Sequence, residues 1–191
     1  MTELKAFVNK FNPISEETFV ELQKCFKPMK LSKNEFFVRE CNYAQKLGYL
    51  KKGAVRAFFL NKECKEYTKQ FFVDSSIIGA YSSLLTKQPN QIAQQALTDC
   101  EILVANFSEI EKLYNKFHEL ERLGRKIAEF YFLEKEQKEL EMALLDADKR
   151  YLIMRDRFPT IEAIAPQYHI ASYLGISPTQ LSRIRRKLKD T

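Results

Sequence analysis

The sequence is poor in the residues that build metal and redox centres. Its 191 residues include no tryptophan, two histidines and four cysteines, and no two cysteines form a C-x-x-C pair. This spacing argues against a zinc or iron–sulfur site formed by a local motif. We expect reduced thiols in the core or in loops, with a redox-sensing cysteine as the alternative, at Cys25, Cys41, Cys64 and Cys100.

Glycine and proline are also scarce, at 5 and 6 residues, while hydrophobic residues make up 45% and charged residues 29% of the chain. This composition excludes collagen-like and low-complexity classes and is typical of a globular protein. No apolar run approaches the ~20 residues of a membrane span, and the first residues lack the basic and apolar segments of an export signal. We therefore expect a cytoplasmic protein without a membrane partner.

Positive charge is concentrated in the last quarter of the chain. Residues 149–191 contain nine Lys or Arg and three Asp or Glu, so this stretch carries a net charge of +6, equal to that of the whole chain. Such asymmetry indicates a neutral module joined to a basic module that binds a polyanion. A solvated basic tail is the alternative.

The N-terminal part reads as a helix followed by a small barrel. Ser15 can cap the helix, whose apolar stripe is Phe19, Leu22 and Phe26. Short β-branched and aromatic segments then alternate with turn residues, which predicts strands near 35–38, 47–50, 54–60, 67–73, 92–97 and 102–107. We expect an α+β fold with a β-barrel (jelly roll) in residues 1–107, a long helix in 108–145 and a helical unit in 146–191.

The predicted long helix has the spacing of a dimerisation seam. Ser108 and Glu111 have the spacing of a capping box, which would begin the helix. Apolar residues then follow in steps of three and four, as in a coiled coil. Alternatively, the helix lies along the barrel, with Leu123, Phe130 and Leu133 as a second apolar edge, or both arrangements hold. The predicted seam is Ile110, Leu113, Phe117, Leu120, Gly124, Ile127 and Tyr131.

The last 26 residues carry the features of a helix-turn-helix. Pro166 suits the start of a short helix over 167–174, and Gly175 offers the positive φ of a tight turn. Ser177 and Pro178 then form an N-cap and first-position pair that opens a second helix. A helix from 146 to 158 precedes this unit and ends at Pro159. His169 lies in the first helix, where a phosphate contact and a packing role are both open.

The second helix has one buried and one polar face. Leu181, Ile184 and Leu188 share the apolar side, and Thr179, Arg183 and Arg186 fall opposite. This pattern predicts a helix that enters the major groove of double-stranded DNA. Arg183 has the reach to pair with a guanine, and Thr179 and Gln180 can contact bases or phosphates. We expect phosphate contacts from Arg185, Arg186, Lys187 and Lys189.

The order of barrel, long helix and helix-turn-helix resembles the Crp/Fnr (cyclic-AMP receptor protein-like) family of bacterial transcription regulators. The stretch from 166 to 186, PQYHIASYLGISPTQLSRIRR, is the most specific part of this resemblance. The resemblance implies a homodimer on a near-palindromic operator, with contacts from Ser177, Pro178, Thr179 and Arg183. It also implies RNA polymerase as a further partner and a small effector in the barrel.

Two departures from the family pattern concern the effector and the DNA contacts. Family members that bind cyclic AMP hold it with a glutamate and an arginine, where this chain has Ala80 and Asn90. Cyclic AMP or cyclic GMP would lose its charged partners, so an unidentified ligand or none is expected. Many family members have a β-hairpin wing after the recognition helix, whereas only Lys189, Asp190 and Thr191 come after Leu188 in this sequence, so we expect wing strands before Pro166 or no wing. The predicted effector pocket comprises Gly79, Ala80, Tyr81, Asn90, Gln91 and Gly124.

Two other classes of function are alternatives to a DNA-binding regulator. An enzyme is not expected, because the sequence has no phosphate loop, no nucleophile elbow and no H-E-x-x-H motif. The second alternative is an effector-sensing barrel whose basic C-terminal domain docks on a protein partner. Protein docking would depend weakly on salt, whereas DNA binding would weaken steeply as counterions are released.

Overall fold

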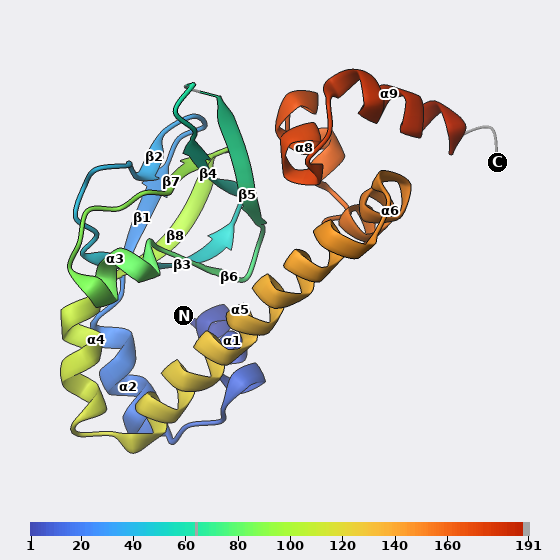
Figure 1. The fold of residues 1–191 in the computed structure, drawn as a ribbon. Helices are drawn as coiled ribbons and strands as arrows, with labels where there is room; N and C mark the ends of the chain where they lie inside the picture. The colour runs from blue at the N-terminus through green and yellow to red at the C-terminus, as the bar shows by residue number, and fades with distance from the viewer. Residues whose placement is uncertain (64, 189–191) are drawn as a thin grey trace.

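The structure is a computed structural model that describes residues 1–63 and 65–188, so Cys64 and Lys189 lie outside the described residues. Two helices precede a barrel of two sheets, and a long helix then crosses beneath the barrel toward a C-terminal helical unit (Figure 1). None of the helices in the described ranges has both the length and the apolar composition to cross a membrane.

The barrel consists of two antiparallel four-stranded sheets, with strand orders β1-β8-β3-β6 and β2-β7-β4-β5. The six predicted strands are present, and the short strands β1 and β6 were missed. β1 is an edge strand, which explains how it tolerates Pro28. The strands are β1 (Lys27–Leu31), β2 (Phe36–Val38), β3 (Lys46–Lys52), β4 (Val55–Leu60), β5 (Glu66–Phe72), β6 (Ser76–Ile78), β7 (Ala93–Ala96) and β8 (Cys100–Asn106).

The turn between β3 and β4 requires glycine. Gly53 has φ +113°, and a Cβ there would lie 2.7 Å from Sγ of Cys100. The two sheets enclose Leu50, Val55 and Ile78, each with no exposed surface. The turn therefore brings β3 and β4 into different sheets around one apolar core.

The N-terminal helices cover the lower end of the barrel. α1 (Thr2–Phe11) was not predicted, whereas α2 (Glu16–Lys24) begins at Ser15 as expected, with the Ser15 side chain accepting a hydrogen bond from the Thr18 amide. Buried residues of both helices, among them Phe7 and Phe19, join one cluster with Tyr49 of β3. This cluster is the surface against which the long helix packs.

The predicted long helix is divided into α4 (Phe107–Tyr114) and α5 (His118–Leu144). The predicted capping box is wrong, because the N-cap of α4 is Asn106, two residues before Ser108. The chain turns at Phe117, whose backbone is extended, and α5 then packs back against α4. Gly124 permits this approach, because a Cβ there would lie 2.8 Å from the hydroxyl oxygen of Tyr114.

The predicted dimer seam faces the chain's own core. Ile110 and Leu120 are buried, and Leu113, Phe117 and Ile127 pack against the N-terminal cluster. The Tyr131 hydroxyl accepts a hydrogen bond from the Ile77 amide at 3.0 Å, so this residue too points to the barrel. The seam prediction is therefore corrected for this subunit: the apolar stripe packs on its own N-terminal helices and barrel, the alternative arrangement.

Four helices follow α5 in the described residues, and three of them, α6, α8 and α9, were predicted, whereas the short α7 was not. Asp146 caps the first, and Gly175, at φ +68°, forms the turn before the last. Residues 107–188 contain no strand, so no wing hairpin lies in that range. The helices are α6 (Ala147–Arg157), α7 (Ile161–Ile164), α8 (Gln167–Leu174) and α9 (Pro178–Lys187); α3 (Tyr81–Thr86) lies between β6 and β7.

Candidate functional site

Helix α9 presents a polar face at the surface. The Ser177 side chain accepts a hydrogen bond from the Gln180 amide at 3.1 Å, which fixes the start of the helix. Leu181 and Ile184 are buried against the rest of the unit, as predicted. All seven predicted DNA contacts lie on exposed positions: Ser177, Pro178, Thr179, Gln180, Arg183, Arg186 and Lys187.

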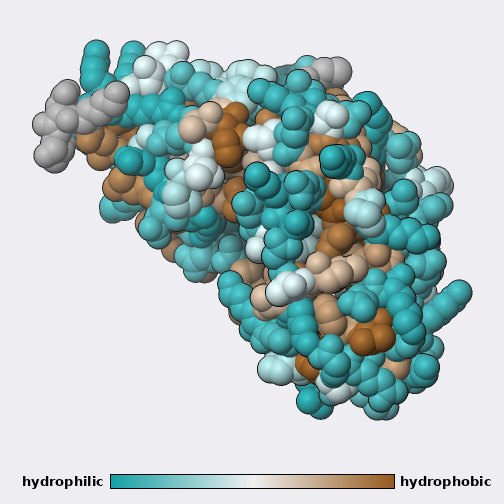
Figure 2. Space-filling model, turned by 180° about the vertical axis from the view of Figure 1, so that it is seen from behind, coloured by the Kyte–Doolittle hydropathy of each residue, from teal (hydrophilic) through white to brown (hydrophobic). Residues whose placement is uncertain are grey.

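The basic residues of α9 differ in their neighbours. Nη2 of Arg185 lies 2.8 Å from Glu162, so this side chain is held by α7 and is not directed away from the protein as a phosphate contact would require. Lys187 pairs with Asp148 at 2.5 Å but remains exposed. Arg183 and Arg186 lie at exposed positions. The C-terminal unit projects from the body of the molecule with a largely hydrophilic surface (Figure 2).

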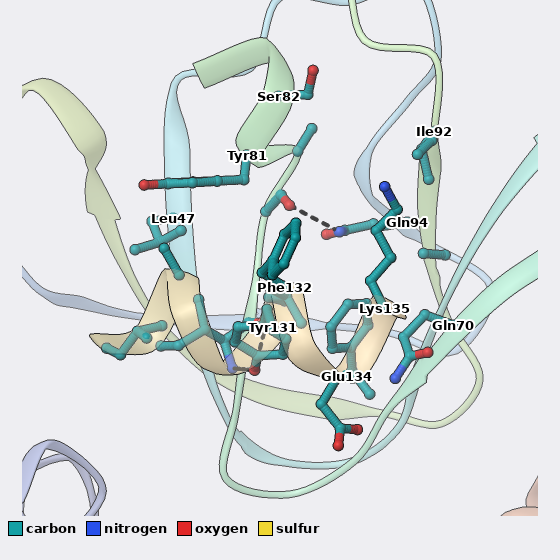
Figure 3. A pocket seen from close by; sticks show the side chains of 18 of the residues that line it. Leu47, Gln70, Tyr81, Ser82, Ile92, Gln94, Tyr131, Phe132, Glu134 and Lys135 are labelled. Carbon is teal, nitrogen blue, oxygen red and sulfur yellow. Dashed lines mark hydrogen bonds between the residues drawn. The ribbon is translucent and has the colours of Figure 1, made fainter. Parts of the chain in front are cut away.

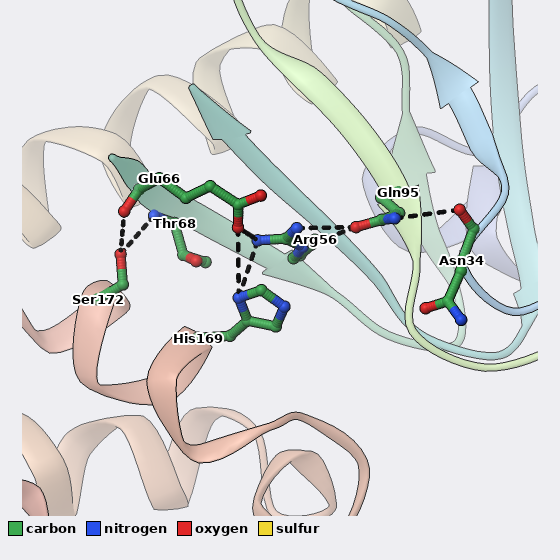
Figure 4. Close-up of polar contacts among 7 residues, drawn as sticks. All are labelled: Asn34, Arg56, Glu66, Thr68, Gln95, His169 and Ser172. Carbon is green, nitrogen blue, oxygen red and sulfur yellow. Dashed lines mark hydrogen bonds and ion pairs between the residues drawn. The ribbon is translucent and has the colours of Figure 1, made fainter. Parts of the chain in front are cut away.

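Helix α8 is docked on the edge of strand β5 (Figures 1 and 4). The Ser172 hydroxyl accepts a hydrogen bond from the Thr68 amide at 2.8 Å and donates one to the Glu66 carbonyl at 3.1 Å. These are the backbone groups that a neighbouring strand would otherwise pair. Ser172 therefore attaches the helix-turn-helix unit to the barrel.

A buried polar cluster lies beside this contact (Figure 4). Arg56 of β4, only 3% exposed, donates hydrogen bonds to Glu66 at 2.5 Å, to Gln95 at 2.8 Å and to His169 Nδ1 at 2.8 Å. Because arginine has only donors, Nδ1 of His169 must accept and the ring is neutral. Burial, with a smaller effect from Arg56, lowers the pKa of His169 to about 4. The hydrogen bond from Arg56 lowers the pKa of Glu66. Thus His169 has a packing role between the domains.

Aromatic contacts continue the interface into the core. The Phe71 ring of β5 lies 5.0 Å from the Tyr173 ring and 5.9 Å from the Phe158 ring, between centroids. The Lys138 ammonium of α5 lies over the Tyr173 ring, with Nζ 3.2 Å from the ring centroid. Its Nζ also donates a hydrogen bond to the Lys69 carbonyl at 2.7 Å. Burial lowers the pKa of Lys138 to about 7. Barrel, α5 and helix-turn-helix unit therefore share one interface.

A cavity of about 1020 Å³ lies between the barrel and α5 (Figure 3). Of the predicted effector-pocket residues, five line the cavity, and the sixth, Gln91, is exposed and is not among the lining residues. The cavity also takes residues that the prediction missed, including Gln70 and Gln94 of the sheet and Phe132 of α5. For the two glutamines, the available signal was the two-residue alternation of side chains along β5 and β7. The five predicted lining residues are Gly79, Ala80, Tyr81, Asn90 and Gly124.

Asn90 supports the loop that borders the cavity. Its side-chain nitrogen donates to the carbonyls of Arg39 and Ile92, and its side-chain oxygen accepts from the Ile92 amide. Both N–H donors of the amide are thus engaged by backbone carbonyls, and its oxygen accepts one backbone N–H. Asn90 therefore shapes the wall and has no N–H left to donate to a ligand.

The chain is similar to a known domain family and to several solved structures. Residues 28–117 match the cyclic nucleotide-binding domain family. FixK2 from Bradyrhizobium japonicum is similar over 86% of this chain and 85% of its own, with 17% identity and a TM-score of 0.74. A regulator of the Crp/Fnr family from Eubacterium rectale, described as putative, is similar over 92% and 84%, with 14% identity and a TM-score of 0.72.

A third structure extends the similarity over nearly the whole of both chains. CLP from Xanthomonas campestris, described as a c-di-GMP responsive global regulator, is similar over 92% of this chain and 92% of its own, with 15% identity and a TM-score of 0.68. No curated protein sequence matches the chain. At such identities the likeness shows a shared fold.

Proposed function

The chain contains a cyclic nucleotide-binding domain and has the fold of the Crp/Fnr transcription regulators, and we propose that it is itself a transcription regulator that binds double-stranded DNA. The observation that carries this proposal is the exposed face of α9. Arg183 and Arg186 stand on it opposite the buried Leu181 and Ile184, on a helix whose start is fixed by Ser177.

In this proposal, α9 enters the major groove with its first residues at the base edges. Arg183 pairs with a guanine through O6 and N7, and Thr179 and Gln180 read neighbouring bases. Arg186 and Lys187 bind phosphates and set the register of the helix on the duplex. The partial positive charge at the start of a helix favours the same orientation.

We propose that the protein acts as a homodimer joined through the outer face of α5. On this helix Tyr131, Lys138 and Met142 line the cavity. On the opposite face, exposed side chains follow one another in steps of three and four, which is the spacing of a coiled coil. That face replaces the seam predicted from the sequence. It consists of Phe130, Leu133, Gln137, Leu140 and Leu144.

Two-fold symmetry then gives each subunit one half-site. The two copies of α9 would contact successive major grooves, ~34–36 Å apart along the duplex. The operator would therefore be a near-palindrome. RNA polymerase is proposed as a further partner on the strength of the family resemblance alone.

The cavity is the proposed place for an effector. The sheet β2-β7-β4-β5 has the cavity on one face and α8 on the other, so a ligand acts on the sheet that holds the helix-turn-helix unit. A cyclic nucleotide does not fit the residues present. No arginine lines the cavity among the described residues, Ala80 offers no carboxylate, and the Asn90 amide is occupied by backbone groups.

The test is selection of bound duplexes from a randomised DNA pool at moderate salt, with the full chain. We expect enrichment of an inverted repeat. A double variant, Arg183→Ala with Arg186→Ala, serves as the control that should enrich nothing. Retention without sequence preference or salt dependence would contradict DNA reading and favour docking on a protein partner, because loss of counterions makes DNA binding steeply salt-dependent.

A further inference from the structure

The walls of the cavity are mainly apolar. Phe59 and Phe72 of the sheet, Ile92 of the following loop and Phe132 of α5 face the same space. Ile92 and Phe132 are labelled in the close view together with Gln70 and Gln94 (Figure 3). A cavity of about 1020 Å³ is at the upper end of the size of small-molecule sites.

Three lysines line the cavity: Lys69 of β5, and Lys135 and Lys138 of α5. Nζ of Lys135 lies 3.5 Å from Glu139, and the Lys135 side chain is 59% exposed at the rim. Nζ of Lys138 donates to the Lys69 carbonyl and lies over the Tyr173 ring. The two lysines of α5 are thus engaged by protein groups, and the third, Lys69, lies at an exposed position of β5, so none of the described lysines is a buried, free cation inside the cavity for a phosphate or a carboxylate.

One polar atom in the wall lacks a partner. Gln94 of β7 is only 4% exposed, and its Nε2 donates to the Gly79 carbonyl at 3.1 Å. Its Oε1 is buried and accepts no hydrogen bond within the described residues. Buried acceptors of this kind are costly and are normally satisfied. The bond to Gly79 fixes the amide orientation, so Oε1 is an acceptor held ready beside the small side chain of Ala57, its partner across the sheet.

We propose that the cavity binds a neutral, largely apolar small molecule that donates a hydrogen bond from a hydroxyl or N–H group to Oε1 of Gln94. The proposal rests on the proposed function, since this molecule would be the effector of the regulator. The apolar walls favour the body of the ligand by removing it from water. The single acceptor orients it and selects against ligands without a donor.

The probe for the test is N-phenyl-1-naphthylamine, a neutral aromatic amine with one N–H whose fluorescence rises in apolar surroundings. Titration of the full chain should give saturable binding of one probe per subunit. Gln94→Met should weaken binding about three- to tenfold, the effect of one lost hydrogen bond. The matched control is Gln91→Met, which alters an exposed glutamine outside the cavity and should leave binding unchanged.

A second variant covers the case in which Gln94→Met, which also loses the bond to Gly79, fails to fold. Ala57→Leu keeps Gln94 and places two methyl groups beside its amide, and it should weaken the probe by a similar factor. Circular dichroism verifies that each variant is folded. Binding that does not saturate, or that neither folded variant weakens, would overturn the proposal.

Competition on the unmodified protein decides the chemical class of the ligand without any variant. Cyclic AMP at submillimolar concentration should not displace the probe, and displacement would overturn the proposal while leaving the regulator intact. DNA selection is scored separately. If duplexes are enriched and the probe does not bind, only the ligand class fails; if the probe binds and no duplex is ever retained, the regulator fails.

Discussion

Gln94 and Gln95 are consecutive in β7 and serve opposite faces of one sheet. Gln94 lines the cavity, whereas Oε1 of Gln95 accepts hydrogen bonds from Arg56 at 2.8 and 3.1 Å on the side where α8 is docked. Successive side chains of a strand point to opposite faces, so only the thickness of the sheet separates the two sites. A shift of β7 on the cavity side must therefore move the Arg56 cluster.

Acidification should weaken the docked arrangement through His169. Its pKa is about 4 in the folded protein, below its ordinary value of 6.5, so between these values the unfolded chain binds a proton that the folded chain does not. The contribution is complete above pH 6.5 and is lost as the pH falls toward 4, at up to about 1.4 kcal/mol per pH unit. Urea unfolding at pH 7, 6 and 5 measures this slope.

His169→Gln should flatten the pH dependence of the free energy of unfolding in that window. The control is His118→Gln, which removes the other histidine, whose side chain is 90% exposed. If His169→Gln and the unmodified protein lose stability in parallel, the neutral buried histidine is excluded as the cause.

Arg183 and Arg186 should differ in what they do to DNA binding. Arg183→Ala should cost ~1–3 kcal/mol at its cognate base pair and relax specificity there. Arg186→Ala should weaken binding evenly across sequences and reduce the salt slope by about one. Binding measured on the selected operator and on single-base variants at several salt concentrations separates the two effects. An even loss from Arg183→Ala would make that residue a phosphate contact.

The outer face of α5 should control assembly. Leu140→Glu with Leu144→Glu places two charges on a stripe whose leucines are 50% and 75% exposed, so it should produce monomers without unfolding the subunit. Sedimentation velocity reads the oligomeric state. The matched control is Leu152→Glu, another exposed leucine, which lies on α6 and should leave dimers unchanged. Intact dimers in the double variant would rule out this face.

Ser172 should protect the Thr68 amide from exchange with solvent. Ser172→Ala removes the acceptor at 2.8 Å and leaves a buried donor unpaired, which should cost about 1–3 kcal/mol in local stability. Hydrogen exchange at Thr68 measures this directly. Ser182→Ala, on the exposed face of α9, is the control. Equal exchange rates at Thr68 in the two variants would show that the bond from Ser172 does not protect this amide.

The helix-turn-helix could be predicted because its signals are local. The cap at Ser177 and the left-handed turn at Gly175 each determine the conformation of a few neighbouring residues, and both are present. The dimer seam could not be assigned, because α5 has apolar stripes on two faces and only the position of α1 and the barrel shows which one is covered. The role of Gln94 was missed for a similar reason: the orphaned acceptor depends on the bond to Gly79, 15 residues away.

The docking of α8 on β5 determines what the barrel would expose if the helix-turn-helix unit came away from it. β5 ends its sheet, and the hydroxyl of Ser172 occupies the Thr68 amide and the Glu66 carbonyl as a neighbouring strand would. A released barrel would expose that ladder beside Phe71, a template on which strands of other molecules can add. The contact that holds the proposed DNA-binding unit against β5 therefore also covers the β5 edge on which other strands could add. In an open form this edge would be exposed, and two open copies could aggregate through it unless the unit docks again or binds DNA.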